Sequence, residues 1–152
     1  MVARPPAPGE CAMKNEPPLQ LPAVLPYLHY EDVAGALEFL SKAFGFAVHL
    51  SMPGSDGAIV HAEMTLGRGV VMLGPESPES GARSPRQLGG VTQSLYVYVD
   101  DVDGHFRHAR EAGVTIVREP ADMFWGDRVY SARDREGHHW TFASPRPEAP
   151  AP

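Results

Sequence analysis

The sequence predicts an α+β fold of two tandem βαβββ modules, whose curved mixed sheets surround a cavity. The prediction rests on an internal repeat at an offset of 69 residues, on one apolar stripe at helical spacing in each copy, and on short strands around each stripe. The 152 residues suit one domain and bury enough surface for one core without disulfides.

The repeat relates LPYLHYEDVAGALEFLSKAFGF (25–46) to SLYVYVDDVDGHFRHAREAGV (94–114). The pairs at this offset include Tyr27 with Tyr96, Asp32 with Asp101, and Gly35 with Gly104. Further on, VHAEMTLGRGVVML (60–73) falls on VYSARDREGHHWTF (129–142), two short strands joined by a polar turn with glycine. Each copy therefore reads as strand, helix and three strands.

The first module is expected over residues 22–74. Its first strand carries apolar residues from Val24 to Tyr30, and the acidic pair Glu31-Asp32 can cap the helix that follows. The apolar stripe of that helix is Val33, Ala36, Leu37, Leu40 and Phe44. Gly45 ends the helix, and the strand AVHLSM (47–52) comes next.

The second module is expected over residues 92–144, with the same order of elements. Its helix follows Asp100-Asp101 and ends at Gly113, before the strand VTIVRE (114–119). Its stripe is Val102, Phe106, Ala109 and Ala112.

A Gly/Ser/Pro-rich linker, residues 75–91, joins the modules into a single domain over 22–144. The leader 1–21 and the tail 145–152 are rich in proline, so both are expected to be disordered.

The single cysteine, Cys11, cannot form an internal disulfide. No apolar run approaches the roughly 18 residues of a membrane span, and the N-terminus lacks a signal-peptide core, so the expected location is the cytoplasm.

The charge balance excludes two broad classes of partner. The net charge is −6 and the isoelectric point is near 5.6. Binding to nucleic acid requires a basic face, and adsorption to an anionic membrane requires a basic cluster. We therefore expect neither a nucleic acid nor a membrane as a partner.

The closing stretch FWGDRVYSARDREGHHW (124–140) resembles the ending of glyoxalase and bleomycin-resistance proteins, including the PhnB-like branch. Together with the repeat, it identifies residues 22–144 as resembling the vicinal oxygen chelate superfamily. This superfamily includes glyoxalase I, extradiol dioxygenases and bleomycin-resistance proteins. The resemblance implies a cavity between the sheets, and it implies a homodimer, because relatives generally dimerise and often build cavities from both chains.

The resemblance also assigns the positions at which metal-using relatives hold their ion. They fall here on Leu25, Met72, Ser94 and Thr141. None of these side chains is an imidazole or a carboxylate, which a divalent site requires. No cofactor is therefore predicted, and chemistry that depends on the ion is disfavoured.

An alternative metal set exists elsewhere. His61 and Glu63 are two apart on a strand and share a face, and His139 would complete a group of two histidines and one carboxylate. The simpler interpretation makes these residues polar parts of the wall or of a sheet edge.

The other paired histidines have plainer explanations. His138 and His139 have opposite parity, so at most one faces the cavity, and His138 is expected to cap the turn that Gly137 makes. His105 and His108 lie three apart on a helix, and an exposed helix face explains them.

Strand parity and one aromatic segment define the expected ligand wall. The predicted ligand-binding residues are Tyr27, His29, Met72, Ser94, Tyr96, Tyr98, Trp125, Arg128 and Thr141. Tyrosine rings suit a flat, partly polar ligand, although they also serve as filler in a sheet. The loop EPADMFWGDR (119–128) either grips a ligand or packs on another surface. Asp127 with Arg128 is expected to form an ion pair that fixes this loop, and the alternative role of Arg128 is to bind an anionic group.

No catalytic residue is assigned, because the folded part has no cysteine and Ser94 has no evident base. The favoured hypothesis is a metal-independent protein that binds, and so sequesters, an aromatic or heterocyclic antibiotic. One alternative is a metal-dependent lyase or dioxygenase that uses the set at His61. The other is a protein–protein module whose cavity holds no ligand.

Overall fold

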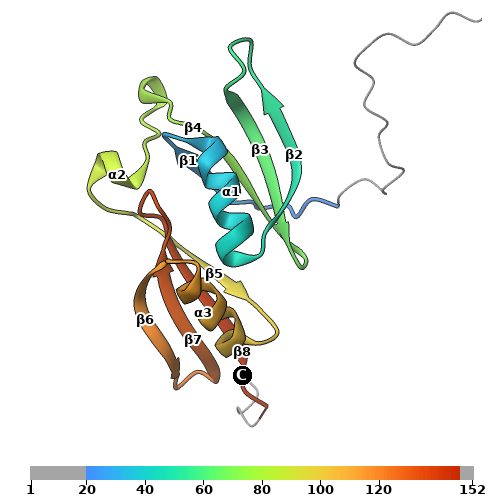
Figure 1. The fold of residues 1–152 in the computed structure, drawn as a ribbon, viewed down its shortest axis with the longest axis vertical. Helices are drawn as coiled ribbons and strands as arrows, with labels where there is room; N and C mark the ends of the chain where they lie inside the picture. The colour runs from blue at the N-terminus through green and yellow to red at the C-terminus, as the bar shows by residue number, and fades with distance from the viewer. Residues whose placement is uncertain (1–19, 148–152) are drawn as a thin grey trace, which may run out of the picture.

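The computed structural model describes residues 20–147 (Figure 1). The predicted pair of modules is confirmed, each a strand and a helix followed by three strands. In chain order the elements are β1 (Tyr27–Tyr30), α1 (Val33–Phe44), β2 (Ala47–Pro53), β3 (Ile59–Leu66), β4 (Gly69–Pro75), η1 (Pro78–Ser80), α2 (Pro85–Leu88), β5 (Ser94–Tyr98), α3 (Val102–Glu111), β6 (Thr115–Asp122), β7 (Asp127–Arg133) and β8 (His139–Pro145). Most of the leader and tail expected to be disordered lies outside the described residues.

The two sheets share one topology. The strand order is β1-β4-β3-β2 in module one and β5-β8-β7-β6 in module two. In each sheet the first strand runs parallel to the last one, and the other pairs are antiparallel, so both sheets are mixed. Each sheet leaves two edge strands, β1 and β2 in one and β5 and β6 in the other.

Helix capping explains why the repeat keeps Asp and Gly together. The Asp32 carboxylate accepts a hydrogen bond from the Gly35 backbone N–H at 3.0 Å, and Asp101 does the same for Gly104 at 3.1 Å. A Cβ atom on either glycine would collide with the capping carboxylate. Gly45, at φ 81°, then ends α1 in the left-handed conformation that glycine adopts without strain.

The two modules share one hydrophobic core. The predicted stripe of α1 is buried, and so are Val102, Phe106 and Ala109 of α3. The ring of Phe44 lies 4.7 Å from that of Phe142, and Phe46 lies 5.4 Å from Trp140, centroid to centroid. The end of α1 therefore packs on β8 of the other module.

Two histidines of α3 join the helices. The ring of His105 donates to the backbone carbonyl of Phe44 across 2.9 Å, and that of His108 donates to the carbonyl of Lys42 across 2.7 Å. These carbonyls belong to the last turn of α1, where they lack partners within the helix. Exposure on a helix face is therefore the wrong explanation for His105, whose pKa is lowered by burial.

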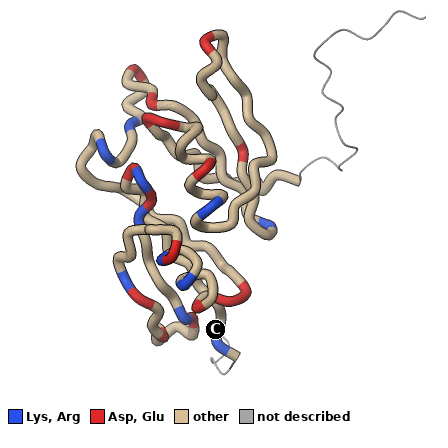
Figure 2. The backbone as a smooth tube through the Cα atoms, in the orientation of Figure 1, with Lys and Arg blue, Asp and Glu red and all other residues tan. Residues whose placement is uncertain are grey.

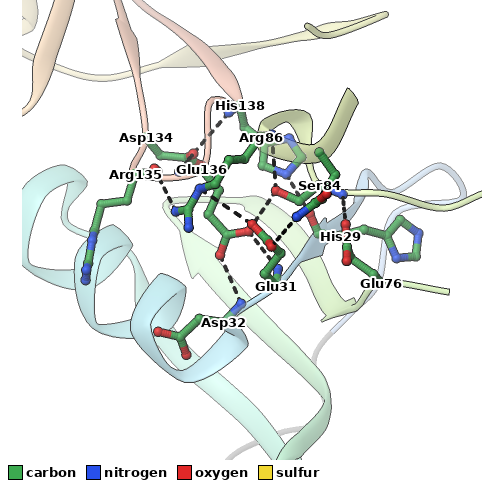
Figure 3. A network of polar contacts seen from close by, with 11 residues as sticks. His29, Glu31, Asp32, Glu76, Ser84, Arg86, Asp134, Arg135, Glu136 and His138 are labelled. Carbon is green, nitrogen blue, oxygen red and sulfur yellow. Dashed lines mark hydrogen bonds and ion pairs between the residues drawn. The ribbon is translucent and has the colours of Figure 1, made fainter. Parts of the chain in front are cut away.

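The turn between β7 and β8 (residues 134–138, the β7–β8 turn) docks on module one (Figure 3). The buried carboxylate of Glu136 accepts from the backbone N–H groups of Glu31 at 2.6 Å and Asp32 at 3.0 Å. It also accepts from the Ser84 hydroxyl at 2.7 Å. A single acidic side chain thus links the start of α1, the linker and module two.

The same turn contributes Asp134 and His138. Asp134 accepts from the Tyr30 hydroxyl at 2.6 Å and from the indole N–H of Trp140 at 3.1 Å. The His138 ring donates to the backbone carbonyl of His29 across 2.9 Å and lies on the ring of Tyr30. The backbone of His138 does close the turn, because its N–H donates to the Asp134 carboxylate and its carbonyl accepts from the Asp134 N–H. Its side chain, however, leaves the turn and reaches the first strand of module one.

Three further details differ from the sequence-based expectations. Residues 119–128 are not one long loop, because β6 extends to Asp122 and β7 begins at Asp127. The linker contains the short helices η1 and α2. The repeat alignment also slips by one in β3, because Met72 pairs with Glu63 whereas Thr141 pairs with Ser131.

Charged residues of both signs are interspersed over the two modules (Figure 2). Among residues 20–147, no helix is long and apolar enough to cross a membrane.

Candidate functional site

Each sheet has a face turned away from its helix, called here its free face. Along β1, Leu28 is 2% exposed toward the helix, whereas Tyr27 is 43% exposed on the free face. The same alternation in β5 buries Leu95 and places Ser94, Tyr96 and Tyr98 on the free face. The predicted parity of these strands is confirmed.

On module one, the free face carries a line of three polar side chains. The Tyr27 hydroxyl lies 3.1 Å from Nδ1 of His61, and Nε2 of His61 lies 3.4 Å from a carboxylate oxygen of Glu63. In the neutral imidazole, the proton belongs on Nε2, because a carboxylate only accepts hydrogen bonds. Nδ1 then accepts, and Tyr27 donates its hydroxyl proton inward.

Gly74 makes this line possible. It lies beside His29 in the strand register, and the ring of Tyr27 crosses directly over it. A Cβ atom at this position would lie 2.5 Å from the Tyr27 hydroxyl oxygen. The side chain of Tyr27 can therefore reach His61 only because residue 74 has none.

The other predicted residues of module one lie around this line. His29 donates from Nδ1 to the Pro75 carbonyl across 3.0 Å, and its ring lies 5.1 Å from the ring of Tyr27. Met72 lies opposite both Tyr27 and Glu63 in the sheet register. Tyr27, His29 and Met72 thus lie close together, and their role as ligand-binding residues stays a prediction.

On module two, two tyrosines converge on one acid. Tyr96 and Tyr98 donate to the same oxygen of Asp127, at 2.6 and 2.9 Å. Burial, and then the bond to Asp127, raises the pKa of Tyr96 to about 12, and the bond to Asp127 raises the pKa of Tyr98. Trp125 donates from its indole N–H to the Tyr96 oxygen across 3.2 Å. Both phenols remain protonated at neutral pH.

The remaining free-face residues of module two form two pairs. The hydroxyls of Thr141 and Ser131 lie 2.9 Å apart. Arg133 donates to Nε2 of His139 across 3.0 Å, and His139 lies opposite Ser94.

Arg128 lies on the opposite face of the sheet. Its guanidinium binds both oxygens of Asp103 in α3, at 3.0 and 3.1 Å from Nε, and reaches Asp122 at 3.0 Å. The expected ion pair between Asp127 and Arg128 is wrong, because adjacent residues of a strand point to opposite faces. This placement separates Arg128 from the other predicted ligand-binding residues.

A broad, open groove of about 1250 Å³ runs between the two modules. Its lining includes the predicted residues Tyr27, Ser94, Tyr96 and Tyr98. It does not include His29, Met72, Trp125, Arg128 or Thr141. Sequence reasoning missed Phe46 and the β3–β4 turn at Arg68, which also line it. It also missed the free-face role of Asp127, although the parity of β7 would have placed that residue on the same face as Ser131.

The positions that hold a metal in relatives do not fit one here. Met72 and Thr141 lie beside Tyr27 and Tyr96 in the register, and neither a thioether nor a hydroxyl suits a divalent site of the imidazole and carboxylate type. In the alternative set, His61 and Glu63 lie together, but His139 belongs to the other sheet. Across residues 20–147, no three His, Cys, Asp or Glu side chains gather with metal-binding geometry.

The family follows from a match to nearly the whole folded part. The model of the Glyoxalase/Bleomycin resistance protein/Dioxygenase superfamily matches residues 24–142. The chain belongs to this superfamily. The superfamily's fold accounts for the two mixed sheets, whereas membership of its PhnB-like branch stays a prediction.

Relatives and solved structures agree with this assignment. An uncharacterised protein of Mycobacterium tuberculosis strain H37Rv is 40% identical over 128 residues, which cover 82% of this chain and 75% of that protein. The crystal structure of TioX from Micromonospora sp. ML1 is 36% identical, with a TM-score of 0.66, and the match covers 78% of this chain and 94% of TioX. TnmS3, an antibiotic binding protein from Streptomyces sp. CB03234, is 21% identical, with a TM-score of 0.64 and coverage of 80% and 93%.

Proposed function

We propose that this protein binds an aromatic or heterocyclic small molecule without a metal ion, and that it acts by sequestering that molecule, an antibiotic for example. One observation carries the proposal: Tyr27, Tyr96 and Tyr98 present half-exposed rings along one groove. Rings of this kind bind flat ligands by stacking and by hydrogen bonds at their polar edges. Sequestration requires only affinity, which withdraws the ligand from its target by mass action.

The donor chemistry supports a site that works without an ion. The equivalent positions in the two modules, Met72 and Thr141, offer a thioether and a hydroxyl. Both side chains suit an adaptable organic wall better than a divalent cation. TnmS3 adds a precedent for the fold, because it is an antibiotic binding protein with the same architecture. At 21% identity, this likeness concerns the fold alone.

The proposal includes a homodimer. In one chain the groove is open, and the free faces carry exposed apolar side chains such as Leu50 and Met52 in addition to the tyrosines. The edge strand β1 has a partner on one side only, and so has β5. A second copy related by two-fold symmetry would cover these faces and would close the groove into a cavity. The expected place of action is the cytoplasm.

Binding can be tested on the full chain with a thermal-shift screen against a broad library of aromatic compounds. A ligand at about 100 times its dissociation constant should stabilise the fold by about 2.7 kcal/mol. Trp125 is half-exposed near the groove, whereas Trp140 is fully buried, so a bound ligand should change the fluorescence of Trp125. This change should disappear in Trp125→Phe.

The variant Tyr96→Ala should weaken binding of a library hit at least tenfold, whereas Tyr130→Phe on the helix face should leave its affinity unchanged. Two outcomes contradict the proposal. One is the absence of any ligand in the screen. The other is stoichiometric zinc, nickel, manganese or iron in protein purified without chelator, lost in His61→Ala, because it would indicate a metal-dependent enzyme.

A further inference from the structure

Asp127 is a buried carboxylate that has no cationic partner in the described part of the chain. The residue is 7% exposed, and the donors to its carboxylate in the described chain are the two phenols of Tyr96 and Tyr98. Within residues 20–147, none of the ion pairs includes it. Burying a carboxylate is costly unless a positive charge or several donors compensate, and two neutral phenols compensate only in part.

Among residues 20–147, the nearby arginines do not form ion pairs with Asp127. Arg128 binds Asp103 and Asp122 on the helix side of the sheet, and Arg146 also pairs with Asp122, at 3.7 Å. On the free face, Arg118 reaches the Met123 sulfur at 3.8 Å. Arg133 binds His139 at the far end of β7. The negative charge of Asp127 therefore remains available to a ligand.

Three aromatic rings border this carboxylate. Tyr96, Tyr98 and Trp125, which we call the aromatic corner together with Asp127, are each between 45% and 61% exposed. The rings of Tyr96 and Tyr98 meet edge to face, with centroids 5.5 Å apart. The aromatic corner lies within one chain, so it does not depend on a second copy.

The hydrogen-bond donors of the three rings in the aromatic corner are already used within the protein. Both phenol protons point at Asp127, and the indole N–H points at the Tyr96 oxygen. Ring faces and oxygen lone pairs remain, and each attracts positive charge. The aromatic corner therefore presents no free donor from these three rings to an anionic or acceptor group.

We propose that the aromatic corner receives a positively charged, alkylated amine of the bound molecule. The inference rests on the proposed binding function and narrows its ligand class to cationic compounds. The ammonium group lies over the ring faces, where the quadrupoles attract it and the charge of Asp127 offsets its own. Alkyl groups on the nitrogen suit this arrangement, because the rings solvate them by contact rather than by hydrogen bonds.

The test compares choline with 3,3-dimethylbutan-1-ol, an uncharged molecule of the same shape. Both are titrated into the full chain at low salt and followed by Trp125 fluorescence and calorimetry. Choline should bind about tenfold more tightly or better, which is the scale expected for a cation over several aromatic rings. The preference should decrease as potassium chloride is added.

Matched variants separate the rings from their hydroxyl groups and from the charge. Tyr98 is 61% exposed, so its replacement leaves the core intact. Tyr98→Phe should keep most of the affinity for choline, and Tyr98→Leu should lose several-fold. Asp127→Asn should reduce the preference for choline several-fold without abolishing it, because the ring faces still attract the cation. Binding of the alcohol should change less than threefold. A thermal melt shows that each variant is folded.

The outcomes for the two proposals are distinct. Equal binding of the two probes by the wild type overturns the cationic ligand class, and so does binding of neither probe. Binding of neutral aromatic compounds in the library screen would still support the proposed function. Equal losses in Tyr98→Phe and Tyr98→Leu would also overturn the inference, because they would assign the effect to the hydroxyl group rather than to the ring.

Discussion

The two modules end their last hairpins in different ways. In module one, Leu66 pairs with Gly69 across the two residues Gly67 and Arg68, and the turn is exposed. In module two, Arg133 pairs with His139 across five residues, and the β7–β8 turn is buried against module one. Duplicated units have thus diverged at their turns, one remaining at the surface and the other joining the modules.

The difference also changes the meaning of the DREGHHW motif. Its two acidic residues and its first histidine form hydrogen bonds to module one, and its tryptophan packs on Phe46 of module one. The motif is therefore chiefly structural in this chain. Three experiments compare the two modules directly, beginning with the largest expected effect.

The first experiment removes the acid that anchors the turn. Asp134→Ala leaves the buried Tyr30 hydroxyl and Trp140 indole without their acceptor, and it removes two further bonds from the backbone N–H groups of Glu136 and His138. The free energy of unfolding should fall by about 3–5 kcal/mol, measured by urea denaturation. Arg68→Ala in the other turn should change it by less than about 0.5 kcal/mol. Similar losses in the two variants would show that the turns are equivalent after all.

The second experiment concerns the residue under the free-face tyrosine. Gly74 of module one corresponds to Ala143 of module two in the repeat. Gly74→Ala should destabilise the protein by about 1–3 kcal/mol in thermal unfolding and displace the ring of Tyr27, because the new methyl group overlaps it. Ala143→Gly should cost about 0.5–1 kcal/mol through chain flexibility alone. An unchanged Tyr27 environment in Gly74→Ala, seen by NMR, would contradict the proposed packing.

The third experiment concerns His105, which links α3 to the last turn of α1, and it should have the smallest effect on stability. Burial lowers the pKa of His105, so the folded state binds a proton less readily than the unfolded chain. Neutral His105 therefore contributes to the free energy of unfolding above its pKa in the unfolded chain, which is about 6.5. This contribution is lost as the pH falls through the lower pKa of His105 in the folded state. Between pH 7.5 and 5, the urea midpoint of the wild type should fall more than that of His105→Gln. The difference between the two decreases should be on the order of a few tenths molar.

The exposed His49 of β2 provides the control for this experiment. His49→Gln should retain the pH dependence of the wild type. Identical pH profiles for the wild type and His105→Gln would mean that His105 does not carry the effect.

Sequence reasoning predicted the elements of the fold because their signals are local. The repeat, the stripes of α1 and α3 and the capping acids Asp32 and Asp101 all depend on neighbours within a few residues. Parity then placed Tyr27 and Tyr96 on the free faces. These parts of the site could be predicted without coordinates.

Partners distant in sequence could not be predicted in the same way. Glu136 bonds to Glu31, and His138 bonds to the carbonyl of His29, each across more than one hundred residues. Strand parity gives the face of Asp127 but not the identity of its partners, and so the sequence suggested its neighbour Arg128 instead of the two tyrosines. Some of the missed contacts depend on how the modules pack together, and those of Asp127 depend on how two strands of one sheet place their side chains.

The shared core makes the two modules inseparable as folding units. A chain cut in the linker would leave Phe44 and Phe46 bare on one fragment and Trp140 and Phe142 bare on the other. Each fragment would then need its counterpart in order to fold, as in a split reporter protein.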